Sequence, residues 1–193
     1  MRVPSLEECY RILEEEGVPP HILRHSEKVA LVAAFLARNL RDLGEPLSLP
    51  LVVAGGLLHD LTKHRSLETG ENHAESARRR LLERGFPEVA EVVGQHIFLK
   101  PGPPGTPLRA EEVVYYADKR VRHEEIVSLK ERFQDLRERY GRRPASWVRI
   151  WRLEELTKLL ERRLFKRLPF GPEKVLELNQ VEDVKACFTA WLS

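Results

Sequence analysis

The chain has 193 residues, of which 42% are hydrophobic, enough to bury one complete core. Its net charge of +2 is too small for a general nucleic-acid binder, and its longest apolar run, residues 51–58, is too short to cross a membrane. The N-terminus lacks the apolar segment of a signal peptide, so we expect a soluble cytoplasmic protein. Cys9 and Cys187 lie far apart without metal-type spacing, which predicts free thiols.

Helix signals recur along the whole chain, whereas the alternating pattern of strands is nearly absent, so the predicted fold class is all-α. Ser5 and Glu8 form a capping box for a first helix that Gly17 ends. Further helices are predicted at residues 21–43, 48–61, 72–85, 87–96, 110–140 and 144–168. The glycine- and proline-rich segment 100–107 is predicted to be a loop, and residues 171–193 to form two short helices.

The chain is expected to have two parts: a helical-bundle domain over residues 1–140, and a C-terminal helical extension over residues 141–193 packed on or beside it. Charge is uneven, because residues 130–167 hold 13 basic and 6 acidic side chains, a local charge of +7. This stretch is either a solvated helical face, the interpretation that we favour, or a surface that attracts anionic substrates or partners.

Three predicted helices place a histidine or an aspartate on the face that should be buried. His25 lies on the apolar stripe of the second helix, His59 follows Gly55 and Gly56 and precedes Asp60, and Asp118 lies on the stripe of the sixth. Any one of them alone is more often a hydrogen-bonded core residue or the partner of an arginine. Together they favour a divalent metal, since a lone buried carboxylate costs several kcal/mol.

These residues stand in the segments RHSEKVA, LLHDLTKH and YYADKRV, in the order H…HD…D. This order, with a lysine three places after the first aspartate, resembles the HD superfamily of metal-dependent phosphohydrolases over about residues 20–130. The resemblance implies a helical HD-domain bundle in which His25, His59, Asp60 and Asp118 bind the metal. The subgroup usually reads HDIGK, and Thr62 stands here in place of the glycine.

Two more histidines bear on the number of ions. His73 begins the fourth helix and His96 ends the fifth, as in bacterial two-metal HD proteins such as diadenosine tetraphosphate hydrolases. That likeness implies two ions, with Asp60 bridging them and His73 and His96 holding the second. The ions are expected to be iron, manganese or another transition metal, and magnesium is also compatible. The alternative is a mononuclear site, with His73 an ordinary first residue of a helix and His96 favoured by the helix dipole.

The resemblance implies hydrolysis of a phosphoester or phosphoanhydride bond by a metal-activated water. Asp60 or Asp118 is expected to accept the proton of that water, and Lys63, beside the HD pair, to contact phosphate in catalysis and substrate binding. Arg122, one helical turn beyond Asp118, is also expected to grip a phosphate. His21, His64 and His123 match no ligand position.

The expected partner is a small phosphorylated molecule, with a nucleotide preferred; diadenosine polyphosphates, nucleoside monophosphates and cyclic nucleotides are candidates. We expect no membrane or nucleic-acid partner, while a homodimer is compatible with the sequence. The alternative function is a metal-containing nucleotide- or RNA-binding regulatory module without turnover, which the basic stretch 130–167 would suit. Oxygenase chemistry with two irons, found in a few HD proteins, uses a similar ligand set.

Overall fold

The computed structural model describes residues 2–103 and 105–192. Its elements are almost all helical, which confirms the predicted fold class. In chain order they are α1 (Leu6–Glu15), α2 (Pro20–Asp42), α3 (Leu49–Leu58), α4 (Lys63–Thr69), α5 (His73–Glu83), α6 (Pro87–Gly94), α7 (Ala110–Lys119), β1 (Val121–Arg122), β2 (Glu125–Ile126), α8 (Leu129–Tyr140), α9 (Pro144–Phe165), the 3-10 helix η1 (Pro172–Gln180) and α10 (Val184–Leu192).

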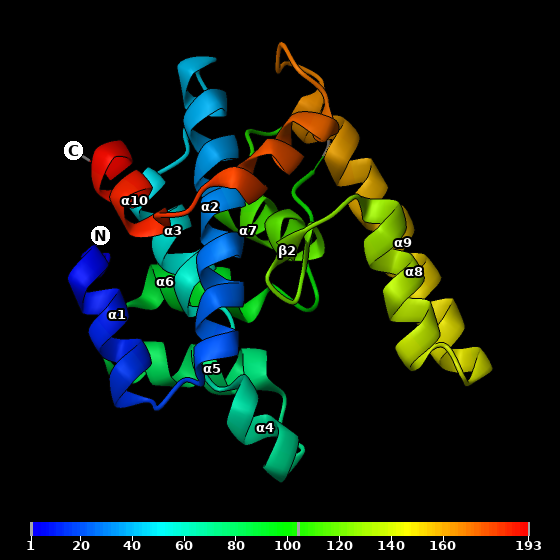
Figure 1. The fold of residues 1–193 in the computed structure, drawn as a ribbon, viewed down its shortest axis with the longest axis horizontal. Coiled ribbons are helices and arrows are strands. Elements are labelled where there is room, and N and C mark those ends of the chain that lie inside the picture. The colour runs from blue at the N-terminus through cyan, green and yellow to red at the C-terminus, as the bar shows by residue number, and fades with distance from the viewer. Residues whose placement is uncertain (1, 104, 193) are drawn as a thin grey trace.

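Helix α2 lies at the centre of the bundle (Figure 1). It packs against α3, α7, α10, the β1–β2 hairpin and η1, and its residues 29–34 are fully buried. The long helices α8 and α9 pack together as a hairpin that projects from the body of the molecule (Figure 1). None of the helices in the described ranges is long and apolar enough to cross a membrane. Cys9 and Cys187 are free thiols, as predicted.

The prediction of one helix over residues 110–140 is wrong. Helix α7 ends at Lys119, and the antiparallel hairpin β1–β2 separates it from α8, with Val121 paired to Ile126. The buried guanidinium of Arg120 explains the break, because it donates to the main-chain carbonyls of Val127 and Pro172 at 2.7 and 3.0 Å. These bonds fold the chain back on itself.

Two further segments can be compared with the prediction. The short helix α4 was not predicted, and it begins directly after the HD pair. The last part of the chain forms η1 and α10, in agreement with the expected two short helices.

The glycines before His59 allow α3 to approach its neighbours closely. A Cβ atom built on Gly56 would lie 2.6 Å from the Cα of Ala30 in α2, and one on Gly55 would lie 2.5 Å from a methyl carbon of Val92 in α6. Main chain cannot move aside as a flexible side chain can. The contact of Gly56 with α2 therefore sets the distance between the helices that carry His25 and His59.

We predict that Gly56→Ala lowers the free energy of unfolding by about 1–3 kcal/mol, the usual cost of overpacking a core. Gly94→Ala is the matched control, since its Cβ would meet only the flexible side chain of Arg78. We expect the control to stay near the wild-type value in urea denaturation. Equal stability of the two variants would show that α2 and α3 can separate at no cost.

Candidate metal centre

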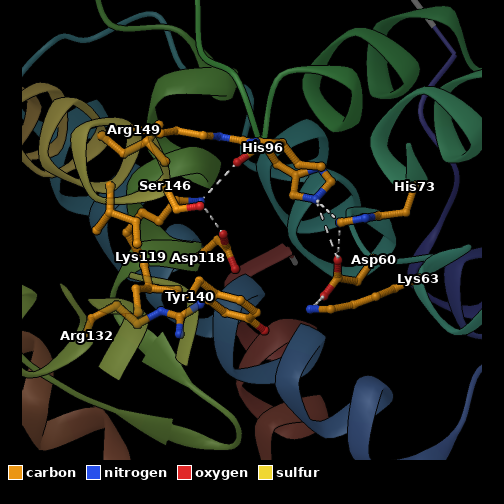
Figure 2. A pocket seen from close by; sticks show the side chains of 14 residues that line it. Asp60, Lys63, His73, His96, Asp118, Lys119, Arg132, Tyr140, Ser146 and Arg149 are labelled. Atoms are coloured by element: carbon orange, nitrogen blue, oxygen red, sulfur yellow. Dashed lines mark hydrogen bonds and ion pairs between the residues drawn. The ribbon is translucent and has the colours of Figure 1, made fainter. Parts of the chain in front are cut away.

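The structure brings together the predicted ligand residues from separate parts of the bundle. Figure 2 shows Asp60, His73, His96 and Asp118, four of these residues. His25 comes from α2, His59 and Asp60 follow α3, His73 begins α5, His96 follows α6, and Asp118 lies near the end of α7. All are buried except His73, which is partly exposed at the cavity. Charged and polar groups thus replace apolar side chains where these helices meet.

Among the described residues, two groups have the spacing to hold a metal ion, and they share Asp60. One group is His25, His59 and Asp60, and the other is Asp60, His73 and His96. The Oδ2 atom of Asp60 lies 3.3 Å from Nε2 of His59 and 3.7 Å from Nε2 of His25. Its Oδ1 atom lies 3.3 Å from Nε2 of His73 and 3.6 Å from Nε2 of His96. Each oxygen of the Asp60 carboxylate therefore lies next to a different pair of histidines.

Asp118 adds a second carboxylate on the side of the first group. Its Oδ1 atom lies 3.3 Å from Nε2 of His25 and 3.7 Å from Nε2 of His59. Two imidazoles and two carboxylates would then surround one position, and two imidazoles and the shared Asp60 the other. Nitrogen and oxygen ligands of this kind suit borderline transition-metal ions.

Main-chain carbonyls orient three of the histidines. The Nδ1 atom of His59 donates to the carbonyl of Gly56 at 2.8 Å, and that of His96 donates to Val93 at 2.7 Å. Both carbonyls belong to the last turn of a helix, where carbonyls have no partner within the helix. His25 makes the same kind of bond to the carbonyl of His123, at 2.6 Å. Because a carbonyl only accepts, Nδ1 carries the proton, and the Nε2 atom of each ring is the one that faces the centre.

The unsatisfied nitrogen atoms fit a bound cation. Nε2 of His59 is buried and has no hydrogen-bond partner among the described residues. Nε2 of His96 lies 3.1 Å from Nε2 of His73. Burial lowers the pKa of His96 to about 4, so at pH 7 this ring is neutral and presents a lone pair. A divalent ion would satisfy the buried Nε2 atom of His59, which the described residues leave unpaired.

The carboxylates give the centre its negative charge. Burial acts to raise the pKa of Asp60 and Asp118, but neighbouring cationic groups outweigh it, and both pKa values lie well below the ordinary range. Burial also acts to lower the pKa of His59, yet the charges of Asp60 and Asp118 raise it overall. The centre therefore holds ionised carboxylates and favours positive charge beside them.

Two lysines lie against these carboxylates. Nζ of Lys63 is 2.6 Å from Oδ2 of Asp60, and Nζ of Lys119 is 2.5 Å from Oδ2 of Asp118 and 3.1 Å from the carbonyl of His96. The Lys63 side chain is 40% exposed at the cavity, whereas Lys119 is buried. We did not identify Lys119 from the sequence, although its position next to Asp118 was a signal.

Arg122 does not join this group, and the premise for its expected role is wrong. It lies in β1 instead of one helical turn beyond Asp118. Its guanidinium pairs with Glu125 at 2.8 Å and lines a different surface hollow, together with Asp135 and Arg139. The structure therefore gives no geometric support for a phosphate contact by Arg122.

A cavity of about 520 Å³ opens next to the ligands. Its lining residues are Asp60, Lys63, His73, His96, Ile97, Asp118, Lys119, Arg132, Leu136, Tyr140, Ser146, Arg149, Ile150 and Leu153. Its size lies within the range of roughly 300–1,000 Å³ that is usual for small-molecule sites. The centre is thus open to a substrate from one side.

Comparison with known proteins agrees with this geometry. No curated protein and no solved structure matches the chain. The family model of the HD domain matches residues 22–145, which include every histidine and aspartate of the centre and nearly two thirds of the sequence. On this match, and with its histidine and aspartate ligands assembled in a helical bundle, the chain belongs to the HD domain family.

Proposed function

We propose that this protein hydrolyses a phosphoester or phosphoanhydride bond, with a nucleotide as substrate and water as the nucleophile. The observation that carries the proposal is the shared Asp60, whose two oxygens face two histidine pairs beside an open cavity. The HD domain family, which typically hydrolyses phosphate bonds with the help of metals, supports the same reaction.

The ligand groups would hold two divalent ions of iron, manganese or another transition metal. His25, His59, Asp60 and Asp118 would hold one, and Asp60, His73 and His96 the other. Ions bound there lower the pKa of a coordinated water to about 7 and neutralise charge on the phosphoryl oxygens.

The protein's own groups supply proton transfer and positioning. Asp60 or Asp118, which both line the cavity, would accept the proton of the attacking water. Lys63 places an ammonium group at the cavity wall, where it would bind a phosphoryl oxygen. Lys119 holds one oxygen of Asp118 and so fixes the orientation of that carboxylate.

We predict that His59→Ala and Asp60→Ala each abolish metal retention and the hydrolysis of p-nitrophenyl phosphate and of bis(p-nitrophenyl) phosphate. Both residues lie at the middle of the ligand set, and helical content measured by circular dichroism should change little. His21→Ala, an exposed histidine, is the control. Undiminished metal in Asp60→Ala would contradict the ligand assignment. Metal binding without turnover in the wild type would favour the regulatory module.

The number of ions is tested by stoichiometry. We predict two ions per chain under metal excess and one in His96→Ala, because that change removes a ligand of the second group alone. Elemental analysis after gel filtration measures both values. A wild-type ratio of one ion per chain that His96→Ala leaves unchanged would show a mononuclear site.

We predict that Lys63→Ala lowers kcat/KM by about one to two powers of ten without loss of metal. Removing one charge-assisted contact costs about 1.5–3 kcal/mol, and Lys63 cannot itself ligate an ion. Arg122→Ala is the matched control, which removes a cation that pairs with Glu125 outside the cavity. Wild-type kinetics in Lys63→Ala, or an equal loss in the control, would refute this role for Lys63.

A further inference from the structure

The cavity extends well beyond the metal centre, and its far wall is the α8–α9 hairpin. Helix α8 contributes Arg132, Leu136 and Tyr140, and α9 contributes Ser146, Arg149, Ile150 and Leu153. In Figure 2, Arg132 and Tyr140 lie on the opposite side of the cavity from His73 and Asp60. A single phosphate group at the metal centre would leave this part of the cavity unfilled.

Arg132 is a largely buried cation with unused donors. Its side chain is 16% exposed, and the one ion-pair or hydrogen-bond partner that the described residues give its guanidinium is Asp135, at 3.3 Å. Its Nε atom is buried without a partner. Asp135 also pairs with Arg139 at 2.7 Å, so a single negative charge is shared between two guanidinium groups. Positive charge therefore remains on this wall of the cavity, and unpaired buried donors are costly unless a ligand satisfies them.

The cavity as a whole carries an excess of positive charge. Its lining holds four cations, Lys63, Lys119, Arg132 and Arg149, against the carboxylates of Asp60 and Asp118, a net charge of +2 before any metal is bound. Arg132 and Lys63 line the same cavity, so an anionic group bound between them would be attracted to both.

Apolar side chains line part of the same cavity. Leu136, Ile150 and Leu153 line the same wall as Arg132, and Ile97 contributes from the loop after α6. Leu136 and Leu153 are partly buried against the core, and both line the cavity. An all-anionic ligand such as pyrophosphate would leave this wall without a partner. The wall fits the organic part of a phosphorylated molecule.

We propose that the α8–α9 hairpin recognises the part of the substrate that is not attacked, with Arg132 binding a second phosphate group and Leu136 and Leu153 packing against the organic moiety. This inference rests on the proposed function and narrows it. The favoured substrates are then organic molecules with at least two phosphate groups, such as nucleoside diphosphates or polyphosphates, over nucleoside monophosphates.

The test is calorimetric binding to the full chain of three probes: AMP, the non-hydrolysable α,β-methylene analogue of ADP, and pyrophosphate. We expect the wild type to bind the diphosphate analogue about tenfold or more tightly than AMP, as one charge-assisted contact provides. Arg132→Gln should reduce this preference to about twofold or less. Arg142→Gln removes an exposed arginine from the same hairpin, outside the cavity, and should keep the wild-type preference.

A second variant separates the apolar wall from the phosphate contact. Leu136→Gln should weaken binding of both nucleotides but not of pyrophosphate, which has no organic part, whereas Arg132→Gln should weaken binding of pyrophosphate. Thermal unfolding of each variant shows whether it is folded. Equal losses for AMP and the diphosphate in Arg132→Gln, no preference in the wild type, or no binding of either nucleotide would overturn the proposal.

Turnover of p-nitrophenyl phosphate is measured in parallel, because it depends on the metal centre and tests the proposed function alone. The expected binding pattern without turnover of p-nitrophenyl phosphate, bis(p-nitrophenyl) phosphate or ADP would support the second phosphate subsite and refute hydrolysis. Turnover without the expected binding pattern would support hydrolysis and refute the second phosphate subsite.

Discussion

The burial of the Asp60 carboxylate is the constraint on which the rest of the structure depends. Asp60 is 1% exposed and ionised, and an isolated buried carboxylate would cost several kcal/mol. Several neighbouring elements supply groups that offset this cost. Imidazoles from α2, α5 and the ends of α3 and α6 surround its two oxygens, and Lys63 pairs with one of them. The helices thus surround the Asp60 carboxylate with polar groups, because a purely apolar core would not stabilise its charge.

The same arrangement links helix ends to the chemistry of the centre. A helix leaves its last carbonyls without partners, and in α3 and α6 the histidine that follows takes one of them. The hydrogen bond from Nδ1 to this carbonyl turns the opposite nitrogen of each ring towards the centre. The close contact of Gly56 with α2 then places His59 beside His25, with ring centroids 5.3 Å apart. The packing of α3 against α2 therefore also sets the relative position of the two histidines.

Most of the helices and all of the histidines and aspartates of the centre could be predicted from the sequence, because their signals are local. A polar residue on an apolar stripe and an HD pair after two glycines can be recognised without coordinates. The break after Lys119 could not, since residues 110–140 contain no glycine or proline and His123 adopts a positive φ of 55° that usually favours glycine. One local signal for the start of α8 is present in the sequence, because Ser128 and Glu131 form a capping box, but it was not used in the prediction of a single helix. The cavity wall formed by α8 and α9 depends on how distant segments fold together, which no local pattern reports.

The turn between β1 and β2 limits how the sequence around this centre can change in evolution. The main-chain carbonyl of His123 holds His25, while the imidazole of His123 points elsewhere, to Arg139. Replacing His123 therefore leaves the carbonyl in place, and glycine in particular would suit its backbone conformation. Adding or removing one residue in the turn would shift the register of Val121 with Ile126 and carry the carbonyl away from His25. Among related chains, the length of this turn should vary much less than the identity of its residues.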